Sequence, residues 1–190
     1  MTNKELSPEQ LILLTIKACG GKINGKTLLQ KRIYFISTVM DIELDYKAHY
    51  YGPYSPEIDE GTSCCKALGF IVEQKQGFGV HDPVGFEVRR YDYSLSSDGE
   101  QIFDQMINDF PKEWNDIKKL IKNMKEAGDT GDYVVLSIAA KTHFILDKQK
   151  MPMTVSEIVE KAKSLGWNIN DEQINKASDF LNKLKLVELN

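Results

Sequence analysis

The stretch Gly20–Thr27, with the sequence GGKINGKT, is the first whose residue types and spacing could do chemistry. A glycine, four residues and then Gly-Lys-Thr is the pattern of a phosphate loop, in which Lys26 would contact phosphate and Thr27 would hold magnesium. Such a loop follows a buried strand. Here the apolar residues between Leu11 and Ala18 have helical spacing, so a helix precedes it. We therefore interpret the stretch as the start of a helix. Nucleotide hydrolysis is kept as a hypothesis for the function of the chain, ranked third behind the two given at the end of this section.

The histidines and cysteines do not form a catalytic or metal-binding pattern. No histidine is at ligand spacing from another histidine, cysteine or carboxylate on the same element. The three cysteines give no Cys-x-x-Cys pair and no disulfide framework. An activated thiol at Cys64-Cys65 beside Lys66 stays open, with core packing as the alternative. We expect no catalytic residues, no metal, no cofactor and hence no enzyme.

Tyrosines gather around the turn that Gly52-Pro53 predicts. Tyrosine combines a large contact area with a polar tip and is enriched at protein interfaces. The interpretation is that Tyr50, Tyr51, Tyr54 and the following Glu57 bind a protein partner. The alternative is that these rings pack the loop onto the helices, a role we expect at least for Tyr51.

Basic residues form a second candidate set, for nucleic acid. Lys26, Lys31 and Arg32 lie on one predicted helix, and Lys75, Arg89 and Arg90 lie on two predicted strands. Together they could form a weak phosphate-binding surface. In a helix-turn-helix type of DNA-binding protein, the helix starting at Pro56 would contact the DNA bases and phosphates. Three carboxylates lie within residues 57–60 of this helix, and their charge disfavours sequence-specific DNA recognition. The same carboxylates also suit a solvated helix N-terminus.

Capping signals and apolar spacing predict the elements of the N-terminal part. Helices are expected from Ser7-Pro8 to Gly20, from Asn24 or Gly25 to Met40, and from Ser55-Pro56 to Gly69. FIVEQ and EVRRYDYSL predict two strands joined by a glycine-rich loop. Ser97-x-x-Glu100 predicts the capping box of a long helix that reaches about residue 127, with a break or restart at Pro111. This order is that of a winged helix with a β-hairpin wing.

The C-terminal part is predicted to be helical. Residues 128–132, GDTGD, are the best linker, and helices follow over 133–146, from Thr154 and from Asn170. The expected fold class is mainly α (α+β). A winged-helix domain covers residues 1–110. A helical C-terminal domain, which could be a reduced helix-turn-helix, covers 111–190.

Several of these motifs resemble known families. YSLSSDG (93–99) and KALGFIVEQ (66–74) resemble the wing ending and the third-helix exit of MarR-type and PadR-type regulators. LLQKRIYFIS (28–37), followed by the segment from Tyr46 to Glu73 with its YYGPYS motif, is similar to the microbial YwgA-like proteins. It is more distantly similar to the Panacea (SocA-like) antitoxin and adaptor domains, which have apolar residues where this chain has Tyr54-Ser55. The resemblance covers about the first 110 residues. It implies a non-enzymatic regulator or binding module, commonly linked to toxin neutralisation or mobile elements.

Composition bounds the remaining choices. The chain has 190 residues with a net charge of −4, which argues weakly against a protein coated in nucleic acid. No signal peptide or membrane span is expected, and the reduced thiols indicate a cytoplasmic protein. The leading hypothesis is a regulatory or adaptor protein with a protein partner. The alternative is a DNA-binding transcriptional regulator that forms a homodimer through residues 97–127.

Overall fold

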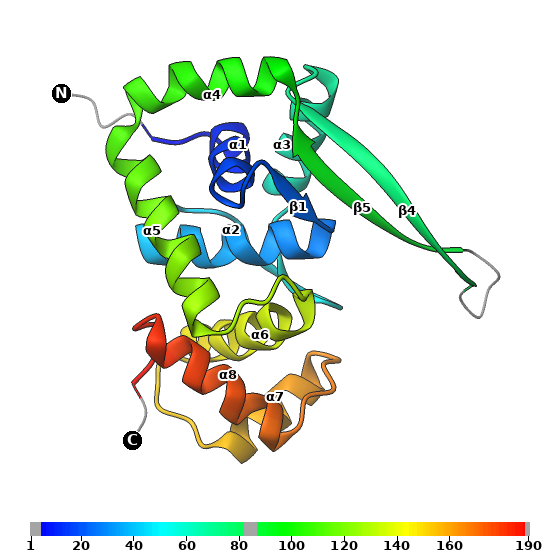
Figure 1. Cartoon of the computed structure of the whole chain (residues 1–190). Helices are drawn as coiled ribbons and strands as arrows, with labels where there is room; N and C mark the ends of the chain where they lie inside the picture. The colour runs from blue at the N-terminus through cyan, green and yellow to red at the C-terminus, as the bar shows by residue number, and fades with distance from the viewer. Residues whose placement is uncertain (1–4, 82–86, 189–190) are drawn as a thin grey trace.

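The computed structural model describes residues 5–81 and 87–188 and is mainly helical, with two small antiparallel sheets (Figure 1). The elements in chain order are α1 (Pro8–Ala18), β1 (Lys22–Asn24), α2 (Lys26–Met40), β2 (Lys47–His49), β3 (Gly52–Tyr54), α3 (Pro56–Ala67), β4 (Ile71–His81), β5 (Glu87–Leu95), α4 (Ser97–Asp109), α5 (Pro111–Ala127), α6 (Tyr133–Gln149), α7 (Val155–Ser164) and α8 (Asp171–Lys183). None of the helices in these ranges combines the length and apolar character needed to cross a membrane.

Three of the eight helices in the described residues, α1, α7 and α8, begin with a side-chain cap at the residue that the sequence predicts. The capping boxes at Ser7, Thr154 and Asn170 are confirmed, each with reciprocal side-chain and backbone hydrogen bonds. Two predicted caps are wrong. Helix α4 is capped by Ser96, whose hydroxyl accepts from the Gly99 amide, and Ser55 makes no capping hydrogen bond to α3. Ser55 instead bonds α2 through its backbone.

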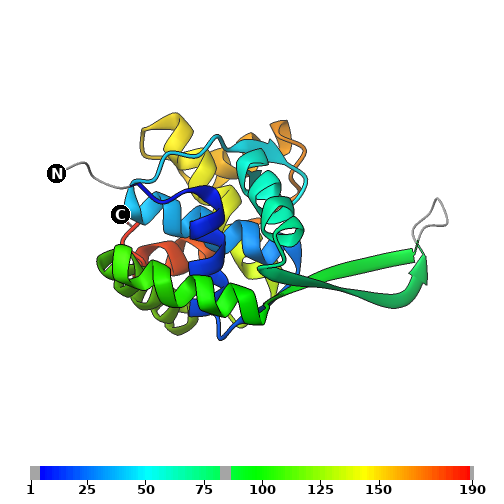
Figure 2. The ribbon, with the colours of Figure 1, turned by 90° about the horizontal axis from the view of Figure 1, so that it is seen from above.

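The main sheet joins a long hairpin to the helical body. Its strand order is β1-β5-β4, and the short strand β1, absent from the sequence expectations, places buried Ile23 opposite buried Tyr93. The β4–β5 hairpin keeps its register from Ile71↔Leu95 to Gly77↔Arg89. Its far half projects away from the helices, as the two views agree (Figures 1 and 2). Strand β4 extends to His81, so Gly77 and Gly79, expected in the loop, belong to the strand. The rest of the predicted loop, residues 82–86, lies outside the described residues.

The break or restart expected at Pro111 is confirmed, and residues 97–127 form two helices. Helix α4 ends at Asp109, buried Phe110 follows, and Pro111 begins α5, which runs in a different direction (Figure 1). Proline lacks the amide that a continuing helix needs, so it restarts the helix instead. Helix α5 buries Ile117, Leu120, Ile121 and Met124 in the core of its own chain. A homodimer through this helix would therefore have to use its lysine-rich outer side.

The hydrophobic core is continuous from the N-terminal helices to the C-terminal ones. Helix α6 packs against α2 and β3, and α8 packs against α5 and α6. The predicted linker, residues 128–132, carries the buried carboxylate of Asp129, which pairs with Arg32 of α2 at 2.8 Å. Asp129 therefore ties this stretch to α2, while Thr130, Gly131 and Asp132 are exposed. Whether residues 1–110 and 111–190 fold separately stays a prediction.

Candidate partner-binding surface

The segment that carries the tyrosines is fixed onto α2 by two consecutive side chains. The Gln30 amide donates to the Ser55 carbonyl at 3.0 Å and accepts from the Ser55 amide at 3.1 Å. The Lys31 ammonium donates to the Pro53 carbonyl at 2.6 Å. From the C-terminal side, the Trp167 indole donates to the His49 carbonyl at 2.7 Å. The β2–β3 segment is therefore held between α2 and the C-terminal helices.

Gly52 allows this close approach. Its φ is +103°, a backbone conformation that side chains disfavour. A Cβ atom here would lie 3.1 Å from Lys141 Cγ and 3.2 Å from Lys31 Cε. Only glycine therefore fits at this position without a shift of both lysines.

A cavity of about 260 Å³ lies between the start of α2 and the β2–β3 segment, and we call it the lysine pocket. It is lined by Lys26, Thr27, Gln30, Lys31, His49, Tyr51 and Tyr54. Burial and, secondarily, the charge of Lys141 lower the pKa of Lys31 to about 7. Within the described part of the chain, the Pro53 carbonyl is the only hydrogen-bond acceptor on this ammonium, which has three protons to donate. An acceptor or anion entering the pocket can therefore bond Lys31.

A second lysine, Lys26, lines the lysine pocket and is itself paired. Lys26 pairs with Asp59, and its ammonium lies 5.9 Å from the centre of the Tyr54 ring. The Tyr54 hydroxyl donates to Asp59 at 2.7 Å, so Asp59 joins the two. Gly25 caps α2 without a side chain, so no side-chain cap occupies the first-turn amides of α2. Here Lys26 and Thr27 of the Gly-Lys-Thr motif begin a helix that follows a three-residue strand.

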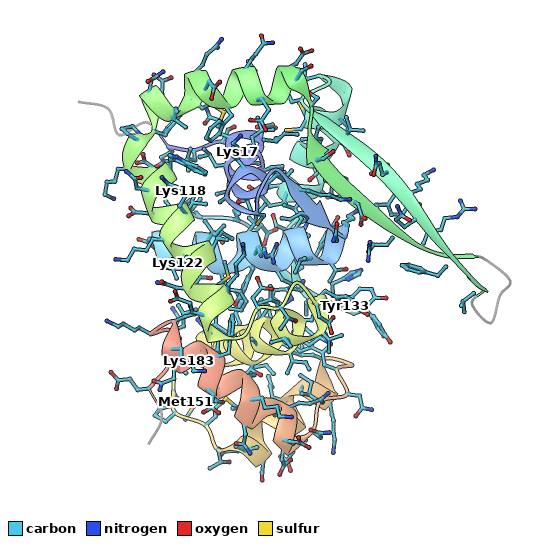
Figure 3. All side chains as sticks on the ribbon, viewed as in Figure 1. Lys17, Lys118, Lys122, Tyr133, Met151 and Lys183 are labelled. Carbon is cyan, nitrogen blue, oxygen red and sulfur yellow. The ribbon has the colours of Figure 1, made fainter. Side chains whose placement is uncertain are left out.

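Three exposed tyrosine rings continue from the pocket along the surface, and we call them the tyrosine edge: Tyr50, Tyr51 and Tyr133. Tyr50 is 72% exposed and the other two are each 42% exposed. The rings meet edge to face, with centroid distances of 4.9 Å and 5.7 Å. Figure 3 shows Tyr133 at the side of the molecule from which the hairpin projects. Tyr133 begins α6, so spacing along the sequence gave no signal that it joins Tyr50 and Tyr51.

The predicted partner-binding set is divided by the structure. Tyr50, Tyr51 and Tyr54 lie together, with Tyr54 half-buried beside Lys26. Glu57 instead accepts from the Asp45 amide at 2.9 Å and lines a different cavity, described below. The interpretation of these four residues as one surface therefore does not hold for Glu57.

Two residues of the predicted nucleic-acid set are inside the protein. Lys31 is 2% exposed and Arg32 is 5% exposed, and both head groups are bonded internally. Arg32 reaches Asp129 at 2.8 Å and the Cys19 sulfur at 3.3 Å. The expectation that these two residues contact phosphate on the surface is wrong, because the basic side of α2 is covered by the tyrosine-bearing segment and the turn at Asp129.

The other basic residues of that set are on or near the surface. Lys26 lies at the lysine pocket, and Lys75, Arg89 and Arg90 lie on the hairpin. Arg90 makes two hydrogen bonds to buried Asp92, at 2.6 Å and 2.9 Å, and packs over Phe78. Lys75 lies over the Tyr91 ring of the opposite strand. The predicted phosphate surface is therefore reduced to the hairpin and one lysine at the start of α2.

A larger cavity of about 670 Å³ lies at the other end of α2, and we call it the acid cavity. It is lined by Tyr34, Ser37, Thr38 and Asp41, by residues 42–46, by Glu57, and by His143, Phe144, Asp147 and Lys148 of α6. The Tyr34 hydroxyl lies 2.8 Å from His143 Nδ1. These two residues are 109 positions apart in the chain, so spacing along the sequence gives no signal that they meet.

Of the three cysteines, Cys64 is exposed, and Cys19 and Cys65 do not have the surroundings of an activated nucleophile. Burial raises the pKa of Cys65 to about 12 and raises that of Cys19 despite the nearby Arg32 guanidinium. Among the side chains of residues 5–80 and 89–188, no three of the His, Cys, Asp and Glu types are grouped so that they could hold a metal ion.

Comparison with known proteins adds one relative. No family model matches the chain. Over 105 residues the chain is 32% identical to the uncharacterised protein YwgA of Bacillus subtilis (strain 168), a match that covers 54% of this chain and 58% of that protein. The chain thus spans less than two thirds of the relative's length. The similarity supports the YwgA-like part of the resemblance, and the Panacea, MarR and PadR parts stay predictions.

Proposed function

We propose that this chain is a regulatory or adaptor protein, without catalytic activity of its own, that binds a protein partner. The tyrosine edge and the adjoining lysine pocket form the binding surface. The observation that carries the proposal is the exposed edge-to-face contact of Tyr50, Tyr51 and Tyr133 beside a pocket with a buried ammonium.

The physical argument rests on what exposed, mutually packed rings contribute to binding. Tyrosine side chains dominate the energetics of many interfaces, because they bury a large area for few rotatable bonds. These rings already contact one another, so less side-chain entropy is lost when a partner covers them. The segment beneath them is fixed by Gln30, Lys31 and Trp167, which favours a preformed surface.

The lysine pocket supplies the chemical preference of this surface. A carboxylate that enters it would favour the charged form of Lys31, whose pKa burial lowers to about 7, and Lys26 lines the same pocket. Charge-assisted hydrogen bonds of this kind are about twice as strong as neutral ones. The favoured partner segment therefore presents an acidic side chain next to apolar or aromatic ones.

The test compares matched surface variants as baits for capture from cell extract. Tyr50→Ser/Tyr133→Ser removes two rings of the tyrosine edge. Phe78→Ser/Val80→Ser removes two exposed apolar side chains of the hairpin, which are 53% and 60% exposed. The expected result is a protein retained by the wild type and the hairpin variant and lost by the tyrosine variant. Equal retention by all three baits, or turnover of a nucleotide that Lys26→Ala abolishes, would contradict the proposal.

A second candidate function is a DNA-binding regulator of winged-helix type. The order α1-β1-α2-β2-β3-α3-β4-β5, in which β1 is the third strand of the hairpin sheet, favours it, as does the projecting hairpin with Lys75 and Arg89. The acidic first turn of α3 opposes it. Binding to labelled duplex DNA across a salt series tests it. Lys75→Ala and Arg89→Ala should each lower the salt slope by about one if the hairpin contacts phosphate. No binding at low salt would exclude this function.

A further inference from the structure

The acid cavity is a second site whose chemistry the proposed function does not use. Its volume of about 670 Å³ is within the usual range for small-molecule sites, roughly 300–1,000 Å³. The C-terminal parts of α2 and α6 form two of its walls, and residues 41–46 form another. The lysine pocket lies at the start of α2, so the two cavities share no lining residue.

The charges around the acid cavity have predominantly one sign. Five carboxylates line it: Asp41, Glu43, Asp45, Glu57 and Asp147. The one ammonium among its lining residues, Lys148, lies over the Phe144 ring at 5.5 Å from the centroid. The C-terminal ends of α2 and α6 add the negative ends of two helix dipoles. A cation inside the cavity is therefore favoured and an anion is repelled.

A buried histidine presents an unused nitrogen to this cavity. His143 is 8% exposed, lines the cavity, and uses Nδ1 for its contact with Tyr34. In the described ranges its Nε2 has no hydrogen-bond partner. Burial lowers the pKa of His143, with Asp147 opposing, so the neutral ring is favoured. When Nδ1–H donates to the Tyr34 oxygen, Nε2 carries a lone pair that accepts a hydrogen bond.

Aromatic rings complete the lining. Tyr34 and Tyr46 meet edge to face at 4.9 Å, and the Tyr46 hydroxyl lies 2.9 Å from the Ser37 hydroxyl. Phe144 lines the cavity from the α6 side. Such rings pack against methylene groups and attract cations to their faces.

We propose that the acid cavity binds an aliphatic polyamine, a small organic ligand with several ammonium groups joined by methylene segments. The ammonium groups pair with the carboxylates, one of them donates to His143 Nε2, and the methylene segments pack on Tyr34, Tyr46 and Phe144. A single small cation would leave most of the carboxylates and most of the volume unused. Asp45 already pairs with Lys47 at 3.1 Å, and a neutral ligand would give no counter-charge to the other four carboxylates. This inference does not rest on the proposed function.

Calorimetric titration of the full chain with spermidine tests the proposal. Asp41→Asn/Asp147→Asn removes two charges from the cavity and preserves shape, and asparagine tolerates the left-handed conformation of residue 41. Asp104→Asn/Glu160→Gln makes the same charge change at exposed positions that line neither cavity. We expect saturable binding to the wild type and the control. The cavity variant should bind about tenfold more weakly per lost carboxylate contact. Circular dichroism checks that both variants are folded.

A neutral ligand and a histidine signal make the test specific. Octane-1,8-diol, which has methylene groups without charge, should not bind. Nitrogen-15 spectra of His143 should show Nε2 as an acceptor in the spermidine complex. The proposal is overturned by an absence of saturable binding in the millimolar range, by equal weakening in both variants, or by binding that leaves the His143 signals unchanged.

Discussion

Lys31 has an environment that its residue type does not predict. It is 2% exposed, lines the lysine pocket and has a pKa lowered to about 7 by burial. The sequence shows a lysine on a helix, and surface exposure is the usual state of that residue. Its burial depends on Gly52 and Pro53 of β3, which come from another part of the chain. The sequence predicts which residue types are present near the lysine pocket, but it does not predict that the Lys31 side chain is buried.

The first prediction concerns the pH dependence of stability. Between pH 7 and the ordinary lysine pKa of about 10.4, the unfolded chain binds a proton at Lys31 that the folded chain does not. The free energy of unfolding should therefore rise with pH, by at most about 1.4 kcal/mol per pH unit from this group. Urea unfolding from pH 7 to pH 9 should show this rise in the wild type and lose it in Lys31→Met. Lys118→Met, on the exposed side of α5, should keep the wild-type slope, and parallel curves for all three proteins would contradict the prediction.

The second prediction concerns the buried pair Arg32–Asp129. Asp129→Asn keeps the oxygen that accepts from the Gly131 amide and leaves the Arg32 charge without its counter-charge. We expect a loss of about 3–5 kcal/mol in the free energy of unfolding. The double variant Arg32→Met/Asp129→Leu should recover part of this loss, because it removes both charges. A double variant less stable than Asp129→Asn would show that the pair does not act through charge.

At the scale of elements, local signals and tertiary contacts explain different parts of the structure. Capping boxes at Ser7, Thr154 and Asn170 predicted three helix starts, because the groups involved are neighbours in sequence. Strands β1, β2 and β3 have three residues each and show no alternation that would predict them. They exist because β5, α2 and α6 offer them partners. Such partners cannot be read from one short segment.

The third prediction tests the packing of β3 on α2 and α6. Gly52→Ala and Gly69→Ala both place a side chain at positive φ, but only the first meets neighbouring atoms. The backbone effect should cost about 1–2 kcal/mol at either position. Gly52→Ala should cost about 1–3 kcal/mol more, because Lys31 and Lys141 must shift. Chemical denaturation measures the free energy of unfolding of both variants. An equal decrease in the two would show that Lys31 and Lys141 move aside without a measurable cost.

At the scale of the whole molecule, the two predicted domains share one core. Trp167 near the C-terminus bonds the His49 carbonyl, and Arg32 of α2 bonds Asp129. A glycine-rich stretch such as 128–132 resembles a linker in sequence, because its composition fits a loop of any kind. Contacts between distant segments decide whether such a loop is mobile or fixed, so the domain boundary could not be established from the sequence.

The fourth prediction is that these parts unfold together. The chain has two tryptophans, Trp114 on α5 and Trp167 after α7. Trp114→Phe leaves a reporter in the C-terminal part, and Trp167→Phe leaves one beside α4. In each variant, the fluorescence midpoint in urea should coincide with that variant's own circular dichroism midpoint. Two separated midpoints within one variant would instead support independent domains.

Helices α2 and α6 are arranged so that their dipoles point the same way. Their starts lie near the lysine pocket and the tyrosine edge, and their ends meet at the acid cavity. The dipoles of the two helices therefore reinforce each other instead of cancelling. The effect of a helix terminus falls off within its first or last turn, so an anion is favoured beside the two starts and a cation beside the two ends. The two proposed ligands, an acidic segment and a polyamine, would therefore bind at opposite ends of α2 without competing for the same surface.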